Sequence, residues 1–384
     1  MPARLVVRIA LVRLGFLLGR LLRRPRRRVV LATSHGAAIS GNLEEILTEL
    51  ARRDPPIPTT VIAFEPRTSL RGLAVAAIAS FRSGFHLAAA RLFVVDDYFL
   101  PMYAIRKRAG TTFVQVWHAS GAFKRFGYSV LDRSFGASEE GVTQFPIHTN
   151  YDRCLVSAMR FASFYAEAFR QPLERFDSSI GIPRTDGLFG ERRAAAERRV
   201  RAAYPLGGRR VILYAPTFRG DTIIAARQPD GLDLALLRQE LGANHVILLR
   251  RHPFVRRTQP LDPGLADFVL DASDHPDIHE LMVASDVLVT DYSSAIYEFS
   301  LLARPMAFFA PDRQTYERER GFYFDYREGV PGPVFDTTAD LAAWLSAGEF
   351  DLDRVARFRD ESFDVADGRA TARFVDQVVI PALR

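Results

Sequence analysis

Short apolar runs that alternate with amphipathic stretches restrict the fold of this chain more than any other feature of its sequence. In the first half, predicted strands at 29–32, 59–64, 91–96, 111–117 and 153–157 alternate with predicted helices at 43–50, 70–81 and 159–169. In the second half, strands at 210–215, 245–250, 267–270 and 287–290 follow the same pattern, with a helix at 278–284. Strands that alternate with helices form parallel sheets covered by helices on both faces. We therefore expect an α/β protein.

The length of the chain predicts two domains of this kind. A chain of 384 residues is too long to surround a single core. Gly181 and Pro183 mark a turn near the middle, and a charged helix at 190–203 is expected to connect the halves. We predict a helical segment at 1–27, a Rossmann-like domain at 28–187 and a second Rossmann-like domain at 188–384.

One strand–turn–helix stretch, residues 285–299, predicts a phosphate site. An apolar strand ends at Thr290, and a helix is expected to continue through Leu302. Asp291, Ser293 and Ser294 fall where the helix should begin, and all three are good N-cap residues. The first turn of a helix offers unpaired N–H groups and the positive end of its dipole, which bind phosphate. The alternative is an ordinary capped helix without a ligand.

Polar clusters at two other strand ends strengthen the prediction of a phosphate site. Thr217 and Arg219 follow the strand at 210–215, and Arg251 and His252 follow the strand at 245–250. The carboxyl ends of parallel strands meet at one edge of a sheet, so we expect these clusters to converge with the stretch that begins at Asp291. Arginine binds phosphate with two parallel hydrogen bonds, which suits a diphosphate.

His118 is the candidate general base of the first domain. It follows the strand that ends at Trp117 and is followed by a loop containing Gly121 and the cation Lys124. Histidine changes protonation near neutral pH and can accept a proton from a reacting hydroxyl. A purely structural histidine is the alternative. His35, which also follows a strand, is a second candidate.

The charge and cysteine content limit the partners of the chain. The net charge is +6 and comes mostly from arginine, which favours anionic partners. Cys154 is the single cysteine, which excludes an internal disulfide and a cysteine-rich zinc site. No carboxylate pair or His/Asp cluster has the spacing of metal ligands, so we predict no bound metal and no cofactor.

The N-terminal segment, residues 2–24, is predicted to lie on a membrane surface. Val7, Leu14 and Leu21 belong to one helical stripe, with arginines on the other side. The longest uncharged run is far too short to span a bilayer. This pattern is typical of an interfacial helix whose arginines meet anionic head groups. The alternative is a helix that packs on its own domain and has a solvated basic face.

An ordered set of motifs resembles the CDP-glycerol glycerophosphotransferases, the family that builds wall teichoic acid and related polyol-phosphate polymers. The motifs are Trp117-His118-Ala119-x-Gly121-Ala122-Phe123-Lys124-x-x-Gly127, Gly181-x-Pro183-Arg184-x-Asp186, Tyr214-Ala215-Pro216-Thr217-x-Arg219, Arg251-His252-Pro253 and Asp286-x-x-x-Thr290-Asp291-Tyr292-Ser293-Ser294. The set spans residues 29 to about 326 and is specific only as a set. Many members carry Gly-Thr-Pro-Leu after the first histidine, where this chain has Ala119-Ser120-Gly121-Ala122. This departure leaves the acceptor and the transferred polyol open.

The resemblance implies a GT-B-like fold, in which two doubly wound domains enclose a cleft. The first domain would bind the acceptor, and the second would bind a CDP-polyol donor, CDP-glycerol or CDP-ribitol, with glycerol phosphate expected to be transferred. The acceptor would be a lipid-linked glycan or polyol phosphate at the cytoplasmic face of the membrane, and CMP would be released.

The resemblance also suggests roles for individual residues. His118 would be the base and His252 would meet the phosphates, with Lys124, Arg219, Arg251, Thr217, Ser293 and Ser294 nearby. Glu298 would suit a ribose hydroxyl, as in nucleotide sites of related folds, and Asp291 would either orient His252 or cap the helix.

Two other functions remain open at this stage. A GT-B glycosyltransferase with a nucleotide-sugar donor shares the expected fold, and the nucleotide that it releases would distinguish it. A non-enzymatic basic protein that binds membranes is suggested by the arginine-rich start of the chain. Nucleic-acid binding is not expected, because the sequence has neither a pattern of stacking aromatic and basic residues nor a groove-reading module.

Overall fold

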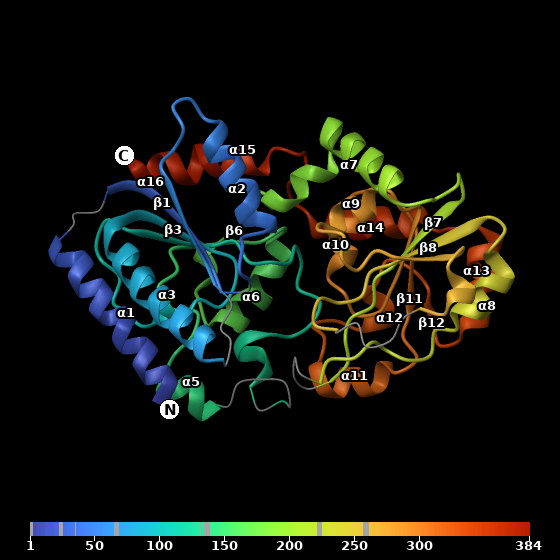
Figure 1. The fold of residues 1–384 in the computed structure, drawn as a ribbon, viewed down its shortest axis with the longest axis horizontal. Coiled ribbons are helices and arrows are strands. Elements are labelled where there is room, and N and C mark those ends of the chain that lie inside the picture. Colours follow the sequence, from blue (N-terminus) through green and yellow to red (C-terminus); the bar gives the residue numbers. More distant parts are fainter. Residues whose placement is uncertain are drawn as a thin grey trace.

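The computed structural model contains two α/β lobes, each built on a six-stranded parallel sheet (Figure 1). It describes residues 3–22, 26–34, 36–64, 69–131, 133, 139–220, 225–255 and 261–384. The fold class predicted from the sequence, with two Rossmann-type lobes and a helix at the N-terminus, is confirmed. His35, the second candidate base, and residues 2, 23 and 24 of the predicted N-terminal segment lie outside the described residues.

The sheet of the first lobe has the strand order β2-β1-β3-β4-β5-β6. Its strands are β1 Arg26–Thr33, β2 Thr59–Ala63, β3 Ala90–Val95, β4 Thr112–Gln115, β5 Arg153–Leu155 and β6 Phe176–Asp177. In β1, Val29 and Leu31 are buried on one face of the sheet and Val30 and Ala32 on the other. A parallel strand covered on both faces needs apolar residues at every position, which explains the continuous apolar runs in the sequence.

Helices cover both faces of this sheet. On one side lie α1 Ala3–Leu22, α3 Leu70–Ala89, α4 Leu100–Tyr103 and α6 Ala162–Phe169, and on the other lies α2 Gly41–Arg52 (Figure 1). Shorter elements are α5 Glu139–Gln144 and the 3₁₀ turns η1 Gly127–Val130, η2 Met159–Phe161, η3 Leu173–Arg175 and η4 Pro183–Leu188. The helix predicted at 43–50 begins two residues earlier, so Gly41 and Asn42 form the first turn of α2.

The sheet of the second lobe has the strand order β12-β11-β10-β7-β8-β9. Its strands are β7 Arg210–Tyr214, β8 His245–Leu249, β9 Val269–Asp271, β10 Val287–Thr290, β11 Met306–Phe309 and β12 Val334–Phe335. The helices are α7 Gly190–Ala203, α8 Leu234–Leu241, α9 Ile278–Val283, α10 Ala295–Ser300, α11 Arg313–Arg320, α12 Tyr326–Gly329, α13 Thr338–Ala347 and α14 Leu352–Ser362, with the 3₁₀ turn η5 Pro263–Leu265. The central strands β10 and β7 are adjacent, so the polar clusters that follow them lie close together.

The last helical segment returns to the first lobe. It consists of α15 Ala370–Phe374, a π-helical turn Val375–Val379 and α16 Ile380–Leu383, and it packs beside α2 on the first sheet (Figure 1). The buried carboxylate of Asp186 accepts hydrogen bonds from the backbone N–H groups of Ala370 and Thr371, at 3.0 and 2.8 Å. These bonds satisfy N–H groups at the start of α15. The predicted division of the chain at residues 187 and 188 stays a prediction.

A second contact between the lobes closes one side of the space between them. The segment after α11 pairs antiparallel with the loop after β4, where Lys124 faces Phe322 across an isolated bridge. Arg125 donates its N–H to the carbonyl of Gly321 at 3.1 Å. The helix α11 that precedes this segment continues to Arg320, and its only buried residue, Tyr316, anchors an otherwise polar helix.

The N-terminal helix α1 packs closely on α3 through glycines. A Cβ atom added to Gly15 would lie 2.1 Å from the carbonyl oxygen of Phe81, and one added to Gly84 would lie 2.0 Å from that of Val12. Small residues at such positions allow two helix backbones to approach. Within α3, Arg71–Ala89 is long and apolar enough to cross a bilayer, but half of this stretch is buried inside the lobe.

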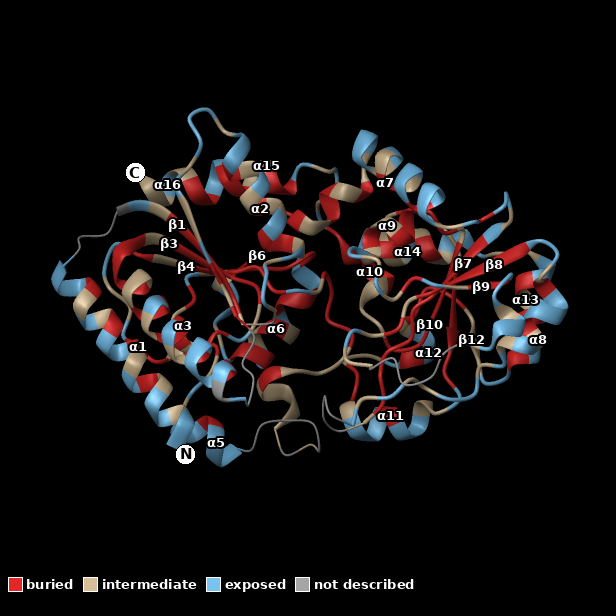
Figure 2. Ribbon diagram, viewed as in Figure 1, coloured by how far each residue is buried: buried red, intermediate tan, exposed pale blue. Residues whose placement is uncertain are grey.

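The outer side of α1 is apolar and exposed (Figure 2). This outer stripe consists of Val6, Val7, Leu14, Leu17, Leu21 and Leu22. Three of its members, Val7, Leu14 and Leu21, belong to the stripe predicted from the sequence. The inner side of α1 buries Ile9, Val12, Gly15 and Gly19. The helix therefore has two apolar sides, one packed on the lobe and one open.

Candidate active site between the two domains

The candidate site is a cavity of about 640 Å³ between the lobes. Six of the residues predicted for the site line it: His118 and Lys124 from the first lobe and Thr217, His252, Ser293 and Ser294 from the second. All six follow the carboxyl end of a strand, as expected for a ligand site in parallel sheets. The cavity brings together side chains that are more than 130 residues apart in the sequence.

The hydrogen bonds of His118 fix the position of its proton. Its Nδ1 atom lies 3.1 Å from the carbonyl oxygen of Asp96, and Asp97 Oδ1 lies at 3.8 Å. A carbonyl oxygen only accepts hydrogen bonds, so Nδ1 carries the hydrogen of the neutral ring and Nε2 has the lone pair. The side chain is 42% exposed and its ring stacks on Trp117 at 4.3 Å. His118 is therefore presented to the cavity as a proton acceptor.

His252 has the opposite arrangement. Its Nδ1 atom accepts the backbone N–H of Phe254 at 3.2 Å. In the neutral ring the hydrogen is then on Nε2, which can donate. The ring is held between Phe218 and Phe254, with ring centroids 4.7 and 4.9 Å away. His252 is therefore suited to donate a hydrogen bond to an anion.

Ser293 and Ser294 lie at the start of α10. Ser293 Oγ accepts the N–H of Ala295 at 3.2 Å, and Ser294 occupies the N-cap position without a side-chain cap bond. The helix ends at Ser300 and so is shorter than predicted. Because α10 has only six residues, we assign the electrostatic effect at this point to individual N–H and hydroxyl groups, not to a long helix dipole.

Asp291 neither orients His252 nor caps α10, and both alternatives from the sequence are wrong. Its Oδ1 accepts hydrogen bonds from the backbone N–H and the hydroxyl of Thr217, at 2.8 and 2.9 Å, and from the N–H of Tyr292. Its Oδ2 lies 2.9 Å from Arg219 Nη2. Because β7 and β10 are neighbours, the nearest partners of Asp291 come from the end of β7.

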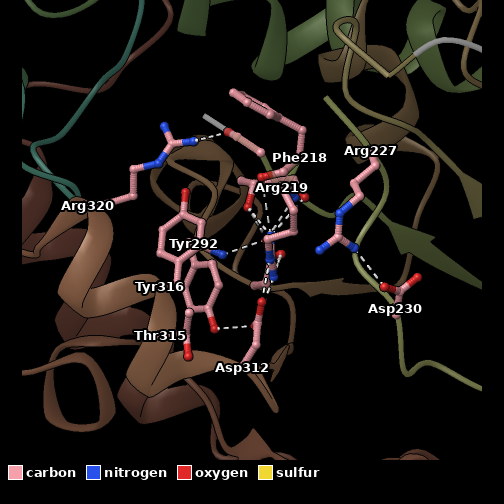
Figure 3. A network of polar contacts seen from close by, with 12 residues as sticks. Phe218, Arg219, Arg227, Asp230, Tyr292, Asp312, Thr315, Tyr316 and Arg320 are labelled. Atoms are coloured by element: carbon pink, nitrogen blue, oxygen red, sulfur yellow. Dashed lines mark hydrogen bonds and ion pairs between the residues drawn. The ribbon is translucent and has the colours of Figure 1, made fainter. Parts of the chain in front are cut away.

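Arg219 is held inside the second lobe beneath the cavity (Figure 3). It is 8% exposed and forms ion pairs with both Asp291 and Asp312. Its guanidinium also lies over the rings of Tyr292 and Tyr316, at 4.9 and 5.0 Å. Burial acts to lower the pKa of Arg219, but the two carboxylates outweigh it and raise the pKa. Arg219 does not line the cavity, and its predicted contact with phosphate stays a prediction.

Arg251 and Glu298 are also buried behind the cavity. Arg251 pairs with Asp271 at 2.5 Å and is 9% exposed. Glu298 is 3% exposed and accepts a hydrogen bond from the Ser120 hydroxyl of the other lobe at 2.9 Å. Neither residue lines the cavity, and the ribose contact predicted for Glu298 stays a prediction.

Among the described residues, three arginines line the cavity: Arg125, which follows Lys124 in the loop after His118, and Arg133 and Arg320, which the sequence did not suggest. Arg320, at the end of α11, donates to the carbonyl of Gly220 at 3.0 Å, and its guanidinium lies over the Phe218 ring at 5.2 Å. These contacts aim its charge at the side of the cavity where His252 lies.

Within the described parts of the chain, no group of three or more His, Cys, Asp or Glu side chains is placed to hold a metal ion. Among the described residues, the cations that line the cavity are Lys124 and the arginines just named. A polyanion that enters the cavity meets positive charge from both lobes.

Two facing Rossmann-type lobes, with a cavity at their strand ends, define the fold as GT-B-like. Solved structures agree: the wall teichoic acid polymerase TagF superposes with a TM-score of 0.78 at 24% identity, covering 99% of this chain and 96% of that one. A UDP-GlcNAc 2-epimerase from Neisseria meningitidis, bound to UDP-GlcNAc, has a TM-score of 0.55 at 13% identity, with coverage of 92% and 99%.

The sequence comparisons identify the family. The model of CDP-glycerol:poly(glycerophosphate) glycerophosphotransferases matches residues 17–380. The teichoic acid ribitol-phosphate primase of Bacillus spizizenii is 36% identical over 364 residues, which are 94% of this chain and 92% of that protein. The teichoic acid poly(glycerol phosphate) polymerase of Bacillus subtilis is 33% identical over 306 residues, with coverage of 77% and 40%. The chain belongs to the CDP-glycerol glycerophosphotransferase family, as its motifs indicated, and is an enzyme of the polyol-phosphate transferase type.

Proposed function

We propose that this enzyme transfers a polyol phosphate from a CDP-activated donor to a hydroxyl group of a membrane-anchored acceptor and releases CMP. The donor is CDP-glycerol or CDP-ribitol, and the acceptor is a lipid-linked glycan or polyol phosphate. The sequence motifs favoured glycerol, whereas the relative that is 36% identical is named for ribitol. Both donors therefore belong in the test.

The opposite hydrogen-bonding states of His118 and His252 carry this proposal. Both histidines line one cavity, and they come from different lobes. His118 presents a lone pair on Nε2, and His252 presents an N–H. Phosphoryl transfer to an alcohol needs a proton acceptor for the alcohol and a donor for the charge that grows on the phosphates. The two lobes supply one of each.

The bond changes follow from this arrangement. The acceptor oxygen attacks the distal phosphorus of the donor, and His118 Nε2 takes the hydroxyl proton. A new bond forms between that oxygen and phosphorus, and the bond from phosphorus to the bridging oxygen breaks. The electron pair of the broken bond leaves with CMP. In such reactions positioning and fixed electrostatics supply most of the rate enhancement.

The groups of the second lobe would stabilise the departing CMP. His252, Ser293, Ser294 and Arg320 all line the cavity. Arg320 gives the site a cation that does not depend on the buried Arg219. Charge-assisted hydrogen bonds of this kind are stronger than neutral ones and strengthen as negative charge grows on phosphate.

We also propose that the outer stripe of α1 attaches the enzyme to the membrane surface. The stripe is apolar and exposed, which is unfavourable in water. Arg4, Arg13 and Arg20 are exposed on the same helix and can meet anionic head groups. Attachment at the cytoplasmic face would keep the enzyme beside a lipid-linked acceptor.

The nucleotide product tests the proposed function directly. The purified enzyme is incubated with CDP-glycerol, CDP-ribitol or a UDP-sugar, together with a lipid-linked acceptor, and the nucleotides are separated by chromatography. The proposal predicts that CMP appears with one or both CDP-polyols and only when acceptor is present. Release of UDP from a UDP-sugar, with no CMP from either CDP-polyol, would instead indicate a glycosyltransferase.

A further inference from the structure

The backbone of the turn that presents His118 is held by a side chain from another helix. Trp117, the residue before His118, has a φ angle of +52°. Left-handed backbone is unfavourable for a bulky residue and persists only where the surroundings fix it. The turn therefore needs partners that keep the strand end in this conformation.

Asn42 supplies two of these partners. Its Nδ2 donates to the carbonyl oxygens of Val116 and Trp117, at 3.0 and 2.9 Å. Asn42 is the second residue of α2 and is only 2% exposed. The orientation of its amide follows from its partners, since both carbonyls only accept and Oδ1 faces an N–H group. One side chain thus satisfies both carbonyls that lead into the catalytic turn.

Arg184 completes the arrangement. Its Nη1 donates to the carbonyl oxygen of His118 at 2.6 Å, and its backbone N–H donates to Asn42 Oδ1 at 2.9 Å. Three consecutive carbonyls, those of residues 116, 117 and 118, are thereby held by two side chains, and the two residues are joined by the bond from the Arg184 backbone N–H to Asn42 Oδ1. Neither side chain is placed to contact the alcohol, because Asn42 is buried behind the turn.

We propose that Asn42 is a positioning residue that sets the direction of the His118 ring, with Arg184 as its supporting partner. This inference rests on the proposed role of His118 as the base. Asn42 holds the backbone to which the His118 side chain is attached. The position of this backbone places Nδ1 of His118 within hydrogen-bond distance of the Asp96 carbonyl oxygen. Without the amide, the left-handed turn relaxes and Nε2 moves away from the attacking hydroxyl.

The main variant is Asn42→Ala, compared with Asn150→Ala as a matched control. Asn150 Nδ2 also donates to two backbone carbonyls of the same lobe, those of Met102 and Ile105, at 2.8 and 2.9 Å. It does not line the cavity between the lobes. We expect Asn42→Ala to lower kcat by about tenfold or more, since small misplacements of reacting groups are costly, and to leave the KM for the CDP-polyol nearly unchanged. Asn150→Ala should leave kcat unchanged, and because alanine is strained at the Asn150 φ of +73°, this control also shows whether a loss of stability alone lowers turnover.

A double-mutant cycle separates positioning from a general loss of structure. In a His118→Ala background there is no base to position, so adding Asn42→Ala should cause no further loss of turnover. An equal fractional loss in both backgrounds would overturn the inference, as would an unchanged kcat in Asn42→Ala. Full turnover in His118→Ala alone would overturn the proposed function, and the inference with it.

A second variant covers the case in which Asn42→Ala does not fold. Arg184→Ala removes the bond to the His118 carbonyl but keeps the backbone N–H that binds Asn42. It should also lower kcat more than it changes the donor KM, and it should also have no effect in the His118→Ala background. A loss that appears equally in both backgrounds would contradict the proposed arrangement.

Discussion

Arg219 and Asp291 form a buried ion pair that joins the ends of two neighbouring strands. Arg219 Nη2 lies 2.9 Å from Asp291 Oδ2, and the two side chains are 9% and 2% exposed. Asp291 in turn accepts both the N–H and the hydroxyl of Thr217. The motif residues at these strand ends therefore bind one another, and these contacts fix the side of the cavity at which they lie.

Removing one partner of this pair should destabilise the protein. Arg219→Met leaves two carboxylates, Asp291 and Asp312, without their cation, and such a loss costs about 3 kcal/mol. Urea unfolding measures the effect. Arg227→Met is the control, because Arg227 pairs with Asp230 at the surface and should change stability by less than about 1 kcal/mol. If Arg219→Met and Arg227→Met have the same free energy of unfolding, the ion pairs of Arg219 contribute little to the stability of the fold.

Arg320 should contribute mainly to donor binding. Arg320→Ala removes one cation from the cavity, and we expect the dissociation constant of the CDP-polyol to rise by about tenfold, as for the loss of one charge-assisted hydrogen bond. Isothermal titration calorimetry measures this constant. Arg318→Ala provides the matched control on the same helix, since Arg318 is exposed and does not line the cavity. If the two variants bind the donor equally well, Arg320 is not a phosphate ligand.

His148 should make the fold sensitive to mild acid. It is fully buried against Phe169, and burial lowers its pKa to about 3. In the unfolded chain this histidine has an ordinary pKa near 6.5. Below that pH the unfolded state binds a proton that the folded state does not bind. The stability that neutral His148 provides is therefore complete above about pH 6.5 and is lost as the pH falls from there towards 3.

The test of this pH dependence compares the wild type with His148→Asn, which keeps a residue that tolerates the local φ of +54°. Between pH 6 and pH 5 the wild type should lose up to about 1.4 kcal/mol of unfolding free energy more than the variant. The other histidines are present in both proteins, so their contributions to the pH dependence cancel in the difference between the two unfolding free energies. Parallel stability curves would mean that His148 is protonated in the folded state.

The outer stripe of α1 should govern attachment to lipid. Replacing Leu14 and Leu17 by glutamate introduces charge on the exposed side without disturbing the packed side, so sedimentation with anionic vesicles should fall strongly. Turnover on a soluble acceptor analogue should persist. Leu173→Glu is a matched control, because Leu173 is about as exposed but lies in η3. Undiminished sedimentation of the double variant would remove α1 from the membrane contact.

The sequence predicted the strands and the edge where the site lies, for a physical reason. Runs such as residues 29–32 and 287–289 are apolar at every position, as a parallel sheet covered on both faces requires. Once the strands are placed, the residues that follow them must meet at one edge. His118, His252 and Ser293 were therefore predictable as lining residues without any knowledge of their partners.

The orientation of individual side chains could not be predicted in the same way. Arg219 turns inward because Asp312, which is 93 residues later, lies beside it, and Arg251 does the same because of Asp271. Arg320 faces the cavity only because α11 crosses towards the first lobe. The sequence around Asn42 does not indicate its role, because the carbonyl groups that it binds are 74 and 75 residues away. Local patterns contain no information about such distant partners.

The role of His118 as the general base is tested most directly by two measurements on His118→Ala: its turnover with saturating CDP-polyol and acceptor, and its affinity for the donor. Turnover of His118→Ala should fall at least about a hundredfold, since a general base typically contributes this much. Its affinity for the donor should be nearly unchanged. Turnover equal to that of the wild type would contradict the assignment of His118 as the base and, with it, the proposed reaction geometry of the cavity.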